Sequence, residues 1–283
     1  VVYKRQGLVH PSAEGPVFYK EIALLRDEML SSDPALISVK MVRLWKEYYN
    51  TVLQYELSDW FVTTRPPMLR IVPARKAVPD DVELLPYEDL YEIMNAAKTY
   101  TVRDCCCRLQ QEKCDKPLHT CIQFNERADY ALMRGGGEKL SREKMFEIEA
   151  MAEDEGLVPM VANIASLEAP GYLCMCCGCC CVVIDPLKRM DKLRKEEGLA
   201  KSRFQAEVDV QECTSCGTCI KRCQFDAIKM KRVEGEKKRK ATVDPELCYG
   251  CGACVLTCES EAIRLKLVRP PEHIPVEHPA LIA

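Results

Sequence analysis

Eight cysteines near the C-terminal end of the chain follow one spacing twice. Both runs read CxxCxxCxxxC and start 35 residues apart: Cys213, Cys216, Cys219 and Cys223, then Cys248, Cys251, Cys254 and Cys258. A four-iron cubane needs four thiolates around a compact core, and cysteines at intervals of three wrap one loop around such a core. The fourth thiolate comes from elsewhere in the chain. The repeat therefore predicts two [4Fe-4S] clusters.

Zinc and disulfides are the competing explanations for so many cysteines. A zinc ion held by paired CxxC elements would also order a small fold, but it does not require the complete four-cysteine spacing to occur twice. Disulfide frameworks are typical of small secreted domains that lack an adequate core. Here the chain has 283 residues, and all 19 cysteines lie after residue 104. We therefore interpret the eight as iron–sulfur ligands.

The residues between these cysteines fit close wrapping of a cluster. Gly217, Gly250 and Gly252 let the backbone approach an inorganic core and donate amide hydrogen bonds to its sulfurs. Matched strand-forming segments precede and follow each half of the repeat, at 206–210, 227–230, 241–243 and 262–265. The repeat thus has a pseudo-symmetric layout.

With this layout, residues 204–268 resemble a bacterial-type two-cluster ferredoxin. The resemblance implies that the two halves exchange their fourth cysteine. One cluster would then take Cys213, Cys216, Cys219 and Cys258, and the other Cys248, Cys251, Cys254 and Cys223. The chain departs from the family at Gln224 and Glu259, where a proline usually follows the fourth cysteine. This departure affects the packing around the ligands and leaves the ligands themselves in place.

Eleven further cysteines form two upstream groups, at 105–121 and 174–181, that match no common metal-binding spacing. Neighbouring side chains of an extended segment diverge, so alternate cysteines can face one cluster more easily than consecutive ones. One candidate ligand set is Cys105, Cys107, Cys114 and Cys121, and the other is Cys174, Cys176, Cys177 and Cys180. Exchange between the sets stays open. Cys106, Cys179 and Cys181 are either small buried hydrophobes or ligands themselves.

The upstream cysteines favour one or two further iron–sulfur clusters. A single cluster of unusual type, a zinc site and free thiols are the alternatives. Arg103 and Arg108 flank the first group, where a guanidinium would offset anionic thiolates and raise a cluster potential; surface ion pairs with Asp104 or Glu112 are the other reading. None of the four histidines has metal-ligand spacing, and His119 has the best case for contacting a cluster.

The upstream pattern resembles a group of proteins from anaerobes that carry a dicluster ferredoxin domain. The resemblance rests on CxCR at 105–108, the segment Glu155-Gly156-Leu157-Val158 at a helix end, and CxCCxCCC at 174–181, and it covers about residues 84–265. It implies a redox protein that serves larger oxidoreductases. Members often begin with a winged-helix-like segment, and residues 6–19 resemble the end of one.

We expect an α+β chain in five parts. A mainly helical region for docking, with the winged-helix remnant, covers 1–83, and the cysteine-rich iron–sulfur module covers 84–184. A charged helical linker (185–203), the ferredoxin-like domain (204–268) and a proline-rich tail (269–283) follow. Hydrophobic spacing predicts helices at 19–30, 33–60, 86–97 and 141–155, and strands at 69–72 and 100–102. We expect the tail to be extended chain that wraps a partner or hangs free.

Charge and missing motifs narrow the function. The formal charge of −3 argues against nucleic acid as the main partner, and no apolar run is long enough for membrane insertion, so we expect a cytoplasmic protein. Motifs for nucleotide binding and common hydrolases are absent. The favoured function is an electron-transfer protein or subunit that exchanges electrons with redox partners in a larger oxidoreductase complex, without a catalytic site of its own. The basic run 229–240 is either a solvated hairpin tip or a docking patch for an acidic redox partner.

Two alternatives remain at this stage. One is a reductase whose upstream cysteines hold an open-site or non-cubane cluster, with a small-molecule substrate that the sequence does not identify. The other is an iron–sulfur redox sensor that binds DNA through the winged-helix remnant, which would require a complete recognition helix and a basic face.

Overall fold

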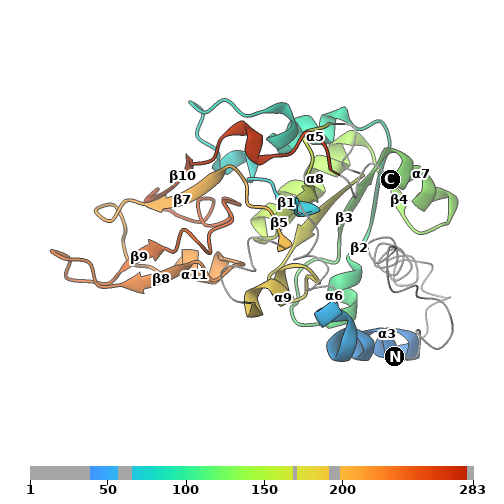
Figure 1. Ribbon diagram of the computed structural model, residues 1–283, viewed down its shortest axis with the longest axis horizontal. Coiled ribbons are helices and arrows are strands. Elements are labelled where there is room, and N and C mark those ends of the chain that lie inside the picture. The colour runs from blue at the N-terminus through green and yellow to red at the C-terminus, as the bar shows by residue number, and fades with distance from the viewer. Residues whose placement is uncertain (1–38, 57–65, 168–170, 191–197, 279–283) are drawn as a thin grey trace.

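A six-stranded sheet organises the upstream half of the protein in this computed structural model, which describes residues 39–56, 66–167, 171–190 and 198–278 (Figure 1). The strand order is β1-β5-β6-β3-β2-β4, and neighbouring strands run antiparallel. The strands are β1 (Leu69–Ile71), β2 (Tyr100–Asp104), β3 (His119–Phe124), β4 (Glu138–Lys139), β5 (Val158–Ala162) and β6 (Tyr172–Cys176). The strands expected at 69–72 and 100–102 therefore become β1 and β2.

Two helices, α5 (Leu90–Ala96) and α8 (Arg142–Asp154), pack against one face of this sheet. Ser141 caps α8, because its Oγ accepts a hydrogen bond from the Lys144 amide at 3.2 Å. Gly156 follows the helix with a φ of 73°, a left-handed conformation that costs glycine little. The helices expected at 86–97 and 141–155 thus lie where hydrophobic spacing placed them, with the 3₁₀ turn η3 (Pro86–Glu88) before α5.

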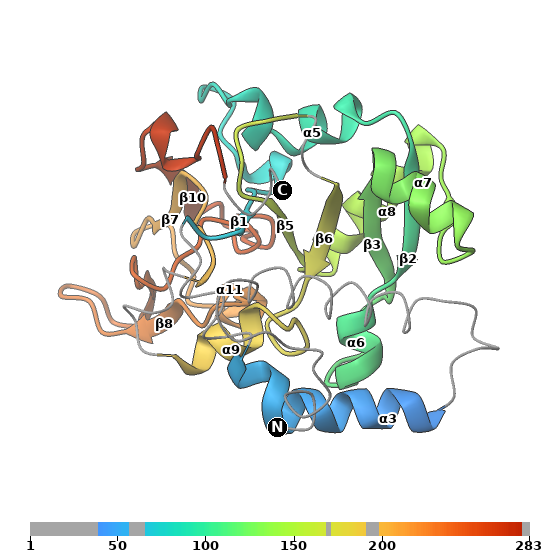
Figure 2. The same cartoon turned by 45° about the vertical axis from the view of Figure 1, so that its right-hand side comes forward.

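The opposite face of the sheet packs against α9 (Ile184–Arg189) and the π-helix η1 (Tyr49–Leu53), which continues α3 (Val39–Tyr48). Tyr49 and Leu53 are buried there. α6 (Cys106–Gln111) lies beside α3 (Figure 2), and the Gln110 side chain donates a hydrogen bond to the Trp45 carbonyl. α7 (Asn125–Met133) lies against β2 and β3. The expected amphipathic helix is helical over 39–56, whereas the helix at 19–30 and the winged-helix remnant lie outside the described residues.

Two short antiparallel pairs build the C-terminal part. β7 (Phe204–Val208) pairs with β10 (Ile263–Leu267), and β8 (Ile228–Lys231) pairs with β9 (Lys240–Val243). α11 (Thr218–Arg222) follows the first cysteines of the repeat. These four strands correspond to the four matched segments of the sequence repeat. The β8–β9 hairpin projects from the molecule at the left of Figure 1.

The C-terminal segment packs on its own chain as far as residue 278. After the 3₁₀ turn η4 (Pro271–His273), the Ala165 amide donates a hydrogen bond to the Pro275 carbonyl at 2.8 Å. Ile274 is buried, and His278 Nε2 lies 2.8 Å from the Pro66 carbonyl oxygen. Up to residue 278 this corrects the expectation of a tail that hangs free, because one apolar side chain and these hydrogen bonds anchor it. Residues 279–283 lie outside the described part.

Helices and strands occur together throughout the described residues, in agreement with the α+β class. The charged helix expected from residue 185 appears as α9, which ends at Arg189, and residues 191–197 lie outside the described part. No helix in the ranges that the structure covers is both long and apolar enough to cross a membrane.

Candidate metal centres

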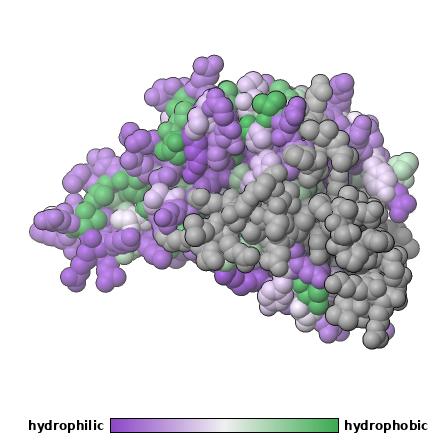
Figure 3. All heavy atoms as spheres, in the orientation of Figure 1, coloured by the Kyte–Doolittle hydropathy of each residue, from purple (hydrophilic) through white to green (hydrophobic). Residues whose placement is uncertain are grey.

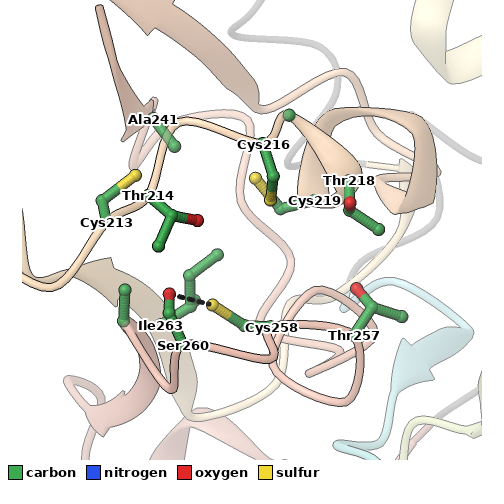
Figure 4. Close-up of a pocket in the computed structure, with 12 residues that line it drawn as sticks. Cys213, Thr214, Cys216, Thr218, Cys219, Ala241, Thr257, Cys258, Ser260 and Ile263 are labelled. Atoms are coloured by element: carbon green, nitrogen blue, oxygen red, sulfur yellow. Dashed lines mark hydrogen bonds between the residues drawn. The ribbon is translucent and has the colours of Figure 1, made fainter. Parts of the chain in front are cut away.

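Four cysteines from both halves of the repeat line one cavity near the β8–β9 hairpin, which we call the outer site (Figure 4). They are Cys213, Cys216, Cys219 and Cys258. Three of them come from the loop and short helix around α11, whereas Cys258 comes from the segment before β10, where its Sγ lies 3.7 Å from Ser260 Oγ. Cys216 is exposed, and hydrogen bonds from the Thr218 side chain and backbone lower the pKa of its thiol. The outer site thus reaches the protein surface.

The other four cysteines of the repeat line a second cavity, the inner site, formed by Cys223, Cys248, Cys251 and Cys254. Backbone amides point at two of the sulfurs: Ala206 donates to Cys248 Sγ at 3.4 Å and Ala227 to Cys223 Sγ at 3.3 Å. Burial raises the pKa of Cys251 to about 12. Such a thiol keeps its proton until a metal ion takes the proton's place.

Glycines allow the chain to pass close to the inner site. Gly250 has a φ of 69°, and a Cβ there would lie 2.1 Å from the Phe204 carbonyl oxygen. A Cβ on Gly252, whose φ is 79°, would lie 2.4 Å from Ala77 Cβ, in the 3₁₀ turn η2 (Arg75–Ala77). Gly217 differs, because its Cβ would meet nothing within 4 Å and its φ of 77° serves the start of α11. Four thiols, amide donors and close backbone passage fit a thiolate-held cluster.

The central sheet divides the upstream cysteines between its two faces. Cys174 and Cys176 alternate along β6, so they share one face, and Cys121 on β3 lies opposite Cys174. The Cys174 thiol is hydrogen-bonded to those of Cys121 and Cys176, and Cys176 is also hydrogen-bonded to Cys181. We call Cys121, Cys174, Cys176 and Cys181 the ladder group. Cys107 packs in the same core as this group.

A second set of thiols, the four-thiol group, belongs to the core on the other face, beneath α5 and α8. It consists of Cys114, Cys177, Cys179 and Cys180, whose Sγ atoms all lie within 4.8 Å of one another. Cys114 Sγ is 3.9 Å from Cys177 Sγ and 3.8 Å from Cys180 Sγ, and Cys179 Sγ is 3.8 Å from Cys180 Sγ.

This division differs from the two ligand sets expected from the sequence. The alternation that puts Cys174 and Cys176 on one face ends with β6, and the chain then turns at Gly178, so Cys177 and Cys180 reach the other face. Cys114 is likewise separated from Cys107 and joins Cys179, for which the sequence left open a small buried hydrophobe or a ligand. Cys105 is the N-cap residue of α6, and Cys106 is buried at its first turn.

Arg108 lies between the two upstream groups and is only 2% exposed. Its guanidinium donates hydrogen bonds to the Met175 carbonyl, at 2.9 Å, and to Thr120 Oγ1. Burial alone would lower the pKa of Arg108, but the negative charges of nearby cysteine thiolates outweigh burial and raise it. Glu112, the suggested surface partner, is paired with Lys46 at 3.0 Å. The buried Arg108 guanidinium is thus close enough to cysteines of both the ladder group and the four-thiol group to stabilise their negative charge.

Other polar residues near the cysteines have different roles. The pKa of Cys177 is lowered to about 4, first by a hydrogen bond from Cys180 and further by the Arg108 charge. The pKa of Cys121 is raised by its hydrogen bond with Cys174 and by burial, and the positive charge of Arg103 opposes this shift. His119 faces carboxylates and not cysteines, because its ring nitrogens lie 3.0 Å from Asp104 and 3.3 Å from Glu138.

Gln224 connects the inner site to the four-thiol group, a contact that sequence reasoning missed. Its Oε1 accepts a hydrogen bond from the Gly178 amide at 2.7 Å, and its Nε2 donates to the Gly156 carbonyl at 2.8 Å. A Cβ on Gly178 would lie 2.3 Å from the Gln224 carbonyl oxygen. The sequence feature that could have indicated this contact is Gln224 itself, which replaces the proline that usually follows the fourth ferredoxin cysteine.

Comparison with known proteins identifies the C-terminal part. The family described as 4Fe-4S dicluster domain matches residues 212–262, which include all eight cysteines of the repeat. No curated protein and no solved structure matches the chain. Residues 212–262 are therefore a 4Fe-4S dicluster domain, and they give this iron–sulfur protein the capability for electron transfer.

Proposed function

We propose that the protein is a non-catalytic electron-transfer subunit that carries electrons between redox partner proteins in a larger oxidoreductase complex of an oxygen-poor cytoplasm. In this proposal the outer and inner sites each hold one [4Fe-4S] cluster, with the fourth cysteine exchanged between the halves of the repeat. When bound, such clusters supply reversible one-electron chemistry. The chain's own residues determine where electrons enter and how the centres are separated from water.

One observation carries the proposal: one hydrophobic core contains cysteines of both the inner site and the ladder group. Cys251 packs in the same core as Cys176 and Cys181. Phe225 and Tyr249 lie in this core too, stacked with their ring centroids 4.3 Å apart. Apolar packing of this kind excludes water, which lowers the local dielectric and affects the potential of a centre placed there.

The ladder group supports a third iron–sulfur cluster beside the inner one. Its thiols follow one another along β3, β6 and the segment before α9, and the tight mutual spacing of the four-thiol group is not found among them. With Cys107 available in the same core, this face offers enough thiols for a further cluster.

Electrons would enter or leave at the outer site, where Cys216 is exposed. The neighbouring β8–β9 hairpin is linked to this site by Lys240, whose Nζ donates a hydrogen bond to the Cys213 carbonyl at 2.8 Å. Figure 3 shows mainly hydrophilic residues at the projecting hairpin. Six exposed cations lie there: Lys229, Lys231, Arg232, Lys237, Lys238 and Arg239. A basic surface beside an exposed ligand suits an acidic redox partner.

The proposal is tested with the full chain purified without oxygen. We expect about eight irons from the repeat and further iron from the ladder group. Cys251→Ser should perturb the paramagnetic resonance signal of the inner cluster, and Cys176→Ser should remove iron while leaving both repeat clusters in place. Cys106→Ser, at a buried cysteine that belongs to neither the ladder group nor the four-thiol group, is the control. Fewer than about eight irons per chain, or clusters that cannot be reduced reversibly, would refute an electron carrier.

A further inference from the structure

The four-thiol group has the dimensions of a site for one metal ion. In a tetrahedral zinc site the metal–sulfur distance is about 2.3 Å, which places neighbouring sulfurs about 3.8 Å apart. Three Sγ–Sγ distances in this group are 3.8, 3.8 and 3.9 Å. We propose that Cys114, Cys177, Cys179 and Cys180 bind a single thiophilic metal ion, zinc or iron, in a tetrahedral site. This site is separate from the electron relay and does not depend on it.

The dicluster domain provides an internal comparison. Its eight cysteines stand around two cavities, as ligands of a many-atom core must. Among the described residues, Cys114, Cys177, Cys179 and Cys180 form the one set of three or more metal-ligating side chains whose ligand atoms all lie within 4.8 Å. The same chain therefore contains two different arrangements of four cysteines, and only the tight one matches a single ion.

The surroundings suit the charge of such a site. One divalent ion with four thiolates has a net charge of two minus. At a buried site, nearby cations or hydrogen-bond donors must compensate this charge. Arg108 is itself buried, and its positive charge acts on Cys177; the Lys113 backbone lies beside Cys180. Both residues lie on the chain beside Cys114, so one short segment supplies a ligand and two compensating groups.

The coordination would be closed. Cys177 and Cys180 are each 1% exposed, and Cys114 and Cys179 are half-buried. Four protein ligands leave no position for a substrate, which is the arrangement of structural metal sites. The ion would hold the loop after α6 against the turn after β6. The Gly178 amide, within that turn, is bonded to Gln224 of the dicluster domain, so the ion also steadies the contact between the two parts.

Metal analysis of the full chain, purified without oxygen, tests the proposal. We expect Cys179→Ser to lose one metal ion per chain, while Cys106→Ser keeps it and both variants keep the irons of the repeat. If the ion is zinc, X-ray absorption at the zinc edge should show sulfur neighbours at about 2.3 Å and no neighbouring metal. If it is iron, Mössbauer spectra should contain a mononuclear tetrathiolate component that disappears in Cys179→Ser.

A second measurement keeps the test valid if the variant does not fold. In the wild-type protein, Cys114, Cys177, Cys179 and Cys180 should resist alkylation together and become reactive together when one metal ion is extracted. Two results would overturn the proposal. Loss of about four irons and their sulfide on Cys179→Ser would show a cluster at these cysteines, and four freely alkylated thiols in the purified protein would show no metal there.

Discussion

At the scale of single residues, a glycine beside the inner site and a glycine in an open turn differ in how well they tolerate a side chain. Gly250 and Gly235 both have positive φ, 69° and 83°. A Cβ on Gly250 would press on Phe204 and Ser202 beside the inner site, whereas a Cβ on Gly235, in the β8–β9 turn, would meet nothing within 4 Å. Alanine substitutions at the two positions therefore distinguish the cost of backbone strain from the cost of a steric clash.

Gly250→Ala is expected to destabilise the protein more than Gly235→Ala. Both substitutions impose a left-handed residue, at a cost of roughly 1–2 kcal/mol, but the first also displaces the Phe204 backbone, for about 1–3 kcal/mol more. Anaerobic denaturant unfolding measures the difference, and iron analysis should show loss from the inner site only in Gly250→Ala. Equal effects of the two variants would contradict close backbone passage at the inner site.

A pair of buried carboxyl groups makes stability depend on pH. Glu149 and Glu153, one turn apart on α8, are 1% and 2% exposed. Burial first, and then the Glu153 carboxylate, raise the pKa of Glu149 from 4.5 to about 9. Between these values the folded protein holds a proton that the unfolded chain releases, so stability falls as the pH rises through this window.

Glu149→Gln is expected to remove much of this pH dependence. The amide is neutral in both states, so the variant should be more stable than the wild type at pH 8 by on the order of 1–2 kcal/mol, with a smaller difference at pH 5. Thermal unfolding at several pH values measures this. Glu147→Gln, at an exposed position of the same helix, is the control. Parallel stability curves for wild type and Glu149→Gln would contradict a proton held by the buried pair.

At the scale of elements, the spacing of hydrophobic residues predicted the helices and strands that are marked within their own segment, by a hydrophobic period and by capping residues. α8 begins after Ser141 and ends before Gly156, and β7 to β10 follow the matched halves of the repeat. Local spacing could not predict which upstream cysteines lie together. Their grouping depends on where β6 ends and on which strand lies beside it, and consecutive cysteines carry no hydrophobic period to mark either.

The β8–β9 hairpin is the element whose charge should control electron entry. Dithionite is an anionic reductant, so the basic hairpin should attract it to the outer site. Replacing Lys237 and Lys238 by glutamate is expected to slow reduction several-fold at low ionic strength, and salt should diminish the difference. Stopped-flow absorbance measures the rate. Lys98, just before β2, and Lys139, in β4, are both exposed and provide the matched double replacement. β4 lies on the opposite side of the molecule from the hairpin (Figure 1). If both pairs slow reduction equally, the hairpin does not guide entry.

At the scale of the whole molecule, the upstream sheet and the dicluster domain are joined by buried polar contacts that the sequence did not reveal. Arg203, just before β7, forms a 2.6 Å ion pair with Glu88 in η3, and both side chains are buried. Gln224 bonds to Gly178 and Gly156. Each contact joins residues far apart in the chain, and no local pattern marks a glutamine or an arginine as the partner of a distant backbone group.

Gln224→Pro should loosen the contact between these two parts at Gly178 without removing a cluster ligand. The change installs the residue that usually follows the fourth ferredoxin cysteine, so the repeat should keep its irons. It removes the two side-chain hydrogen bonds, which we expect to cost about 1–3 kcal/mol and to expose the Gly178 amide. Hydrogen exchange at Gly178, followed by mass spectrometry, reports the loss of the contact directly.

Glu259→Pro is the matched control, because it makes the same replacement at the equivalent, exposed position of the other half. It should leave exchange at Gly178 and the free energy of unfolding nearly unchanged. Gly178 lies in the chain between Cys177 and Cys179 of the four-thiol group. A chelator should therefore extract the metal ion of that group faster from Gln224→Pro than from the wild type, and Glu259→Pro should not change the rate. Identical behaviour of the two proline variants would mean that the dicluster domain and the upstream module are held together elsewhere, with Arg203 and Glu88 the next contact to break.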